Sequence, residues 1–212
     1  MVPDYLEEAG SRTSIKGVIK MGQPNLPYGA FYHIHYRGNN REALFKEDCN
    51  YYWFLDLYKK YINPIADLYA YCLLPTHFHF LLRIKDLNEL ERNYHNEKQI
   101  WWQLRAFLGI YTKTINESYQ RSGHLFEGKG TRNFIEKNEY LFHLITHIHQ
   151  NPQTHGIVSD FRIWPYSSYQ VYKYKDIRSV ITKNIFSDYD LYNTISSVHE
   201  NYVPYDLNFD IG

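Results

Sequence analysis

The sequence is poor in sulfur, carries no net charge and has no long apolar run. Its 212 residues include only two cysteines, Cys49 and Cys72, and two methionines. The cysteines have no metal-ligand spacing and form no disulfide framework, so we expect two thiols in a reducing compartment. No apolar run is long enough to span a bilayer, and the N-terminus has no signal peptide. These absences predict a cytoplasmic protein without membrane contact.

The charge balance limits the partners. The 23 basic and 23 acidic side chains cancel, which argues against a broad surface for polyanions but is compatible with a local basic patch. Aromatic residues are abundant instead: 22 tyrosines contribute to an aromatic content of 18%. Such side chains fill cores, form interfaces and stack on bases. With 44% hydrophobic residues, the length predicts one soluble domain with a sizeable core.

Apolar periodicity predicts an alternation of strands and helices. Strands are expected at 30–38, 67–74, 77–84 and 132–136, and helices at 46–62, 99–120 and 138–150. Asp48 and Asn138 are expected as N-caps, and Pro152 as the end of the last helix. Because Pro75 and Thr76 alone separate two strands, antiparallel pairing is favoured. We therefore predict an α+β fold with helices packed on one face of an antiparallel sheet.

The domain boundaries follow from composition. We expect an N-terminal arm at residues 1–27, rich in turn-forming residues toward its end, and one folded domain at 28–175. A polar tail is expected at 176–212, with a short helix near 189–202. The sequence contains no internal repeat.

The segment "LLPTHFHFLL" places two histidines in an apolar strand. Because side chains alternate along a strand, His77 and His79 project from one face, whereas Phe78 and Phe80 face the other, which we expect to be the core. Two imidazoles on one face of a strand form a bidentate platform for a metal ion. The alternative is that both histidines simply face solvent. A third ligand elsewhere in the chain would favour the metal site over this alternative.

The last predicted helix offers further ligands. Tyr140, His143, His147 and Asn151 fall on one stripe of this helix, beside an apolar stripe that should dock on the sheet. His143 and His147 also have the spacing of a zinc protease pair. That motif requires Glu after the first histidine, whereas Leu144 follows here.

Four blocks together resemble a known family: "YHIHYRGNNREALF", "AYCLLPTHFHFLL", "RSGHLFEGKGTRNFIEKNEYL" and "HIHQNPQTHGIV". They are similar in order and spacing to IS200-like and REP-associated tyrosine transposases, which are HUH single-strand nucleases, over about residues 28–172. The resemblance implies a ferredoxin-like sheet and single-stranded or hairpin DNA, often a repeat, as partner. It also implies a divalent metal, Mg²⁺ or Mn²⁺, and a helix tyrosine that attacks a DNA phosphate.

Residue by residue, the resemblance makes His77 and His79 metal ligands and Asn151 the third ligand. The nucleophile does not carry over, because His147 stands where the family pattern "YIHxNP" has its tyrosine. His147 is therefore open to three roles: a further metal ligand, an unusual nucleophile, or no part in cleavage. Tyr140 lies two helical turns back, about 10 Å along the axis, and is expected to pack.

A basic surface is predicted beside this site. The family position of the glycine-rich loop and of the turn after the first strand implies DNA contacts from seven residues: Arg37, Asn40, Arg41, Arg121, His124, Lys129 and Arg132. Glycines let such a loop approach a phosphate backbone closely.

Three functions remain open on the sequence. The first is a transposase-like domain that cleaves and rejoins DNA by metal-dependent transesterification, and the second is a catalytically inactive, domesticated DNA-binding protein. The third is a zinc-dependent hydrolase that uses His77, His79, His143 and His147. The oligomeric state, monomer or homodimer, is also left open.

Overall fold

The computed structural model describes residues 18–20, 26–135 and 139–174, together with residues 181, 197 and 199. Most of the expected N-terminal arm and C-terminal tail therefore lies outside the described residues. The same holds for the expected N-cap Asn138 and for most of the helix expected near 189–202. Among the residues that were searched, no helix is long and apolar enough to cross a membrane.

The described elements between residues 31 and 154 follow the predicted order, whereas the first strand and the last helix given below were not predicted. The strands are β1 (Val18–Lys20), β2 (Phe31–Arg37), β3 (Ala66–Leu74), β4 (His77–Ile84) and β5 (Thr131–Ile135). The helices are α1 (Asp48–Tyr61), α2 (Glu97–Ser118), α3 (Glu139–Thr154) and α4 (Tyr169–Tyr174), with short 3₁₀ turns at Asn39–Arg41, Arg92–Tyr94 and Phe161–Ile163.

The helix ends correct two predictions. The N-cap of α1 is Glu47 and not Asp48, because the Glu47 and Asn50 side chains form a reciprocal capping box with the backbone. Pro152 does not end α3, which runs on to Thr154. Docking of this last turn, in which Asn151 is completely buried, outweighs the tendency of a proline to stop a helix.

The sheet is antiparallel with the strand order β1-β5-β2-β4-β3. Without the edge strand β1, the chain order β2-α1-β3-β4-α2-β5 gives the strand arrangement of a ferredoxin-like unit. The predicted α+β class is therefore confirmed. Strand β1 lies within the segment expected to be an arm, and it pairs with β5 over three residues.

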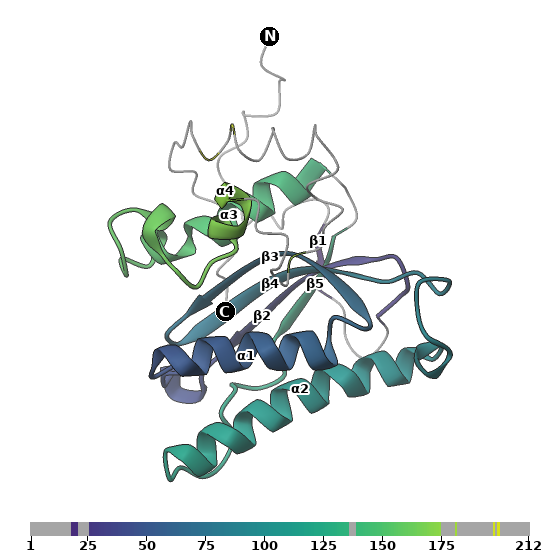
Figure 1. Cartoon of the computed structure of the whole chain (residues 1–212), viewed down its shortest axis with the longest axis horizontal. Helices are drawn as coiled ribbons and strands as arrows, with labels where there is room; N and C mark the ends of the chain where they lie inside the picture. The colour runs from purple at the N-terminus through teal and green to yellow at the C-terminus, as the bar shows by residue number, and fades with distance from the viewer. Residues whose placement is uncertain are drawn as a thin grey trace.

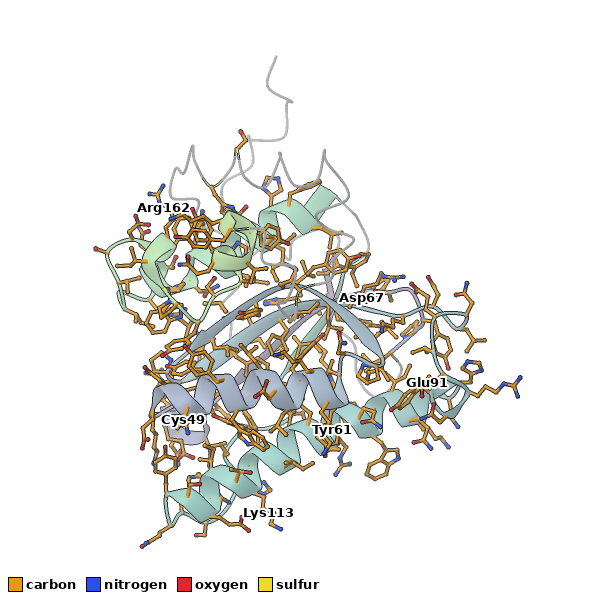
Figure 2. All side chains as sticks on the ribbon, viewed as in Figure 1. Cys49, Tyr61, Asp67, Glu91, Lys113 and Arg162 are labelled. Carbon is orange, nitrogen blue, oxygen red and sulfur yellow. The ribbon has the colours of Figure 1, made fainter. Side chains whose placement is uncertain are left out.

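Helices α1 and α2 cover one face of the sheet, as predicted (Figure 1). The Phe54 ring of α1 lies 4.9 Å from Phe78 and 5.9 Å from Phe80, so these two strand residues do face the core. Phe107 of α2 joins the same cluster, 4.6 Å from Phe54. Figure 2 shows side chains filling the layer between sheet and helices, while Lys113 on the outer side of α2 points away.

Helix α3 lies on the opposite face, which corrects the expectation that all helices pack on one side (Figure 1). Its apolar stripe, Leu141, Leu144, Ile145 and Ile148, is buried, and α3 contacts the sheet through β3 and, to a smaller extent, β4. The histidine face of the sheet is thus covered by a helix rather than open to solvent. The sequence reveals that α3 has a docking stripe but not which face receives it.

Arg83 on β4 ties together three carboxylates from neighbouring segments. It lies 2.8 Å from Asp67, 3.0 Å from Asp86 and 2.9 Å from Glu89. The Arg83 and Asp67 side chains are each only 16% exposed, and Figure 2 marks Asp67 on β3. An ion pair that is largely withdrawn from water is costly to break on one side.

We expect Arg83→Met to lower the free energy of unfolding by about 2 kcal/mol, because Asp67 would lose its charged partner in a poorly solvated position. Urea denaturation monitored by circular dichroism measures the change. The matched control is Lys59→Met, whose pair with Asp56 is exposed on both sides and should matter by less than about 0.5 kcal/mol. Equal effects of the two substitutions would contradict this account.

Candidate metal centre and nucleic-acid interface

Two neighbouring strands place four histidines on the sheet face beneath α3. His77 and His79 come from β4, and His33 and His35 come from β2 in the same alternating pattern. The antiparallel register sets His35 directly opposite His79. The sequence reasoning overlooked His33 and His35, although "YHIHY" repeats the His-x-His spacing of "THFHF" and was the available signal.

Three of these histidines form a cluster of potential metal ligands. One ligand nitrogen each from His35, His77 and His79 lies within 4.8 Å of the others. Two nitrogens bound to one cation at about 2.1 Å each are at most about 4.2 Å apart. The three nitrogens would therefore have to move closer together to share a single ion.

Hydrogen bonds orient two of the rings. His79 Nδ1 lies 3.0 Å from His33 Nε2, and His77 Nδ1 lies 3.0 Å from the Thr76 hydroxyl. Proteins commonly hold metal-binding imidazoles through one nitrogen and present the other to the ion. In both rings the ligating atom would then be Nε2.

Burial and crowding keep the central ring neutral. His79 is completely buried, and burial is the main cause that holds its pKa well below the usual 6.5. The neighbouring rings of His35, His33 and His77 and that of His147 lower the pKa further. A neutral imidazole is the form that binds metals, so His79 is prepared for this role.

Asn151, the third ligand expected from the sequence, lies on α3. Its side chain is completely buried, and its Nδ2 donates to the His147 carbonyl at 3.0 Å. Its Oδ1 has no hydrogen-bond donor among the described residues. Since a buried carbonyl oxygen without a donor is costly, a cation between α3 and β4 fits this residue.

Two further histidines flank Asn151 at a distance of four residues: His147 lies on α3, and His155 follows its last residue. The His155 ring lies 4.6 Å from that of His77, which fixes the end of α3 against the start of β4. His147 is buried, with 6% exposure, and it acts electrostatically on His79. In the described chain, however, the close nitrogen cluster contains His35 and not His147.

The other residues that the sequence placed on this stripe behave differently. His143 is exposed and is not part of the described cluster. The side chain of Tyr140 lies outside the described residues. Of the four ligands expected for a zinc hydrolase, the structure brings His77 and His79 into one cluster and replaces the remaining two with His35.

Comparison with known proteins finds similarity in sequence and in fold. A scan against models of protein families finds no match. A curated protein of Haemophilus influenzae, described as "Putative REP-associated tyrosine transposase", is 26% identical over 145 residues, covering 68% of this chain and 72% of that protein. The chain is similar to REP-associated tyrosine transposases. The resemblance drawn from the four motifs is thereby confirmed.

A solved structure supports the fold. A REP-associated tyrosine transposase bound to a REP hairpin matches with a TM-score of 0.53 and 15% identity, over 76% of this chain and 91% of that one. The match includes most of that protein's length, so the ferredoxin-like unit found here corresponds to the fold of a REP-associated tyrosine transposase.

The residues expected to contact DNA gather at the end of the sheet where β4 begins. Arg37 is the register partner of His77. The turn after β2 and the loop 121–130 are joined by backbone hydrogen bonds from Asn39 N to Leu125 O, at 2.8 Å, and from Glu127 N to Arg37 O, at 2.9 Å. Asn40, Arg41, His124 and Lys129 are exposed there.

Two of the expected contacts are engaged within the protein. Arg121 forms an ion pair with Glu42 and a hydrogen bond with Asn116, so it organises the loop, and a phosphate would have to displace these partners. Arg132 lies over the Trp101 ring, 4.2 Å from its centroid. Of the arginines and lysines predicted to contact DNA, Arg41 and Lys129 are the exposed ones.

Proposed function

We propose that this protein binds single-stranded or hairpin DNA in the manner of a REP-associated tyrosine transposase. The observation that carries the proposal is its likeness in sequence and fold to proteins of that kind, one of which has been solved on a REP hairpin. The exposed cations beside the histidine cluster supply the charge that phosphates require. The neutral overall charge favours a local contact over a long basic track.

A divalent cation belongs to this proposal. His77, His79 and Asn151 would hold it, as the family resemblance implies, and His35 would join them. Of the two ions implied, Mn²⁺ fits this donor set better, because Mg²⁺ is usually held by carboxylate and phosphate oxygens. When bound, such an ion polarises a phosphate and stabilises charge that develops on it.

Strand cleavage depends on His147. An attack by its ring would form an N–P bond, break the P–O3′ bond of the strand and leave a 3′ hydroxyl after proton uptake. Imidazole is a competent nucleophile, but its bond to phosphorus is labile, and His147 is only 6% exposed. We therefore place DNA recognition ahead of cleavage in this proposal.

Binding is tested with hairpin DNA that carries a single-stranded flank, in fluorescence anisotropy at fixed salt, against a fully paired duplex of the same length. Preference for the hairpin supports the proposal, and equal or absent binding overturns it. Cleavage is tested separately, with a suicide substrate and Mn²⁺, by a covalent adduct on a denaturing gel.

His147→Tyr should gain an adduct that the wild type lacks, because tyrosine restores the residue of the family pattern beside an intact metal cluster. His147→Phe, similar in size but without a nucleophilic atom, is the matched control and should give none. An adduct with wild type that His147→Phe abolishes would show that His147 itself attacks. Absence of an adduct from all three would leave a protein that binds and does not cut.

The second candidate function is that of a zinc-dependent hydrolase. The observation in its favour is the third histidine of the cluster, because three imidazoles and an open position are a frequent zinc set in enzymes. Metal analysis separates the candidates: tight stoichiometric zinc would favour the hydrolase, and weaker Mn²⁺ or Mg²⁺ binding would favour the DNA-binding function.

A further inference from the structure

A cavity of about 530 Å³ lies between α2 and the glycine-rich loop 121–130. It is on the other side of the sheet from the metal cluster, because Tyr36 lines it and the adjacent His35 points to the opposite face. Trp101 and Phe126 add aromatic walls, and Arg105 and Lys129 add positive charge. None of its lining residues is acidic.

Gly109 lines the cavity from α2, where a glycine is unexpected. It lies in the middle of α2, where a glycine costs roughly 0.5–1 kcal/mol relative to alanine. A Cβ at this position would meet no atom within 4 Å, so packing within the protein does not require the glycine. Gly130 differs, because a Cβ there would come within 2.4 Å of the Tyr36 ring. What Gly109 preserves is the space of the cavity beside the helix backbone.

The lining indicates the ligand. Flat aromatic walls suit a nucleobase, and base–aromatic stacking contributes about 1–3 kcal/mol per base. Cationic side chains beside these aromatic walls suit the phosphate attached to that base. Arg132 over the Trp101 ring orients the indole before a ligand arrives.

We propose that this cavity binds one unstacked nucleotide of the DNA, with its base against the aromatic wall and its phosphate toward Arg105 and Lys129. The inference rests on the proposed DNA-binding function and names the part of the DNA that is recognised. The loop that forms the cavity is bonded to Arg37 at the end of β2. A strand held beside the histidines therefore reaches the cavity around the end of the sheet.

Gly109→Leu tests the inference, since it puts a side chain into the cavity from a position where an added Cβ meets no atom within 4 Å, and it replaces glycine with a good helix former. Affinity for a hairpin with unpaired nucleotides should fall at least tenfold, while affinity for the same hairpin fully paired stays within twofold. Gly109→Ala is the matched control and should stay within twofold for both. Arg105→Gln, at an exposed position, should weaken the unpaired hairpin about threefold and gives a second test if Gly109→Leu does not fold.

A direct probe separates this inference from the function on which it rests. Nucleoside 5′-monophosphates are titrated into the full-length protein, and tryptophan fluorescence is followed. Saturable quenching that Gly109→Leu abolishes supports the cavity site even if no hairpin binds, in which case only the proposed function fails. Hairpin binding that Gly109→Leu leaves unchanged, or lowers equally for the paired hairpin, overturns the inference alone. Neither nucleotide nor hairpin binding by the wild type overturns both.

Discussion

His79→Ala should weaken the binding of Mn²⁺ or Zn²⁺ at least 100-fold, about 3 kcal/mol. His79 is the central ring of the cluster: its centroid lies 4.5 Å from that of His35 and 5.3 Å from that of His77. Its removal takes away one ligand and also the hydrogen-bond partner of His33. Isothermal titration calorimetry on metal-free protein measures the loss.

Two further variants compare how much His77 and His35 contribute to metal affinity. His77→Ala should be as damaging as His79→Ala, whereas His35→Ala should cost roughly tenfold, as expected for a ligand added to an otherwise sufficient set. His143→Ala is the matched control, because His143 is exposed on the helix that carries Asn151. If His79→Ala keeps the affinity of this control, the metal is bound elsewhere and the assignment is wrong.

Phe54→Ala should be among the most destabilising single substitutions in the described chain, costing about 3–5 kcal/mol. Phe54 is fully buried at the centre of the layer between the sheet and the helices α1 and α2. Its ring lies within 5.9 Å of the rings of Phe45, Phe78, Phe80, Phe107 and Tyr111. A cavity there removes contacts from two strand residues and two helices at once.

Guanidinium chloride denaturation measures this loss, which is a large fraction of the 5–15 kcal/mol that stabilises an ordinary domain. The matched control is Tyr52→Ala on the same helix, whose ring is 60% exposed and whose loss should cost well under 1 kcal/mol. A Phe54→Ala protein as stable as the control would show that the aromatic layer is not the main core.

The stretch "LLPTHFHFLL" shows which structural features could be predicted from the sequence alone. Its alternation placed the strand at 77–84, as observed in β4. It also assigned Phe78 and Phe80 to the core and His77 and His79 to the other face. Local periodicity is encoded in neighbouring residues, so these features needed no knowledge of the rest of the chain.

The membership of the histidine cluster needed the tertiary structure. His35 is 44 residues before His79, and the two meet only because β2 and β4 pair antiparallel in one particular register. A shift of one residue would have turned His35 to the opposite face. The ion pair of Arg121 could not be predicted from the sequence either, because its partner Glu42 is 79 residues away in the chain.

The sequence by itself therefore determined the strands β2 to β5, the helices α1 to α3, the α+β class and the resemblance to REP-associated tyrosine transposases. It also determined that His147 replaces the expected tyrosine. Only the tertiary structure decided that α3 covers the histidine face, that His35 completes a three-imidazole cluster and that a cavity opens beside Gly109. Periodicity and motifs depend on residues close in the chain, whereas a site depends on register and docking between segments that the sequence keeps far apart.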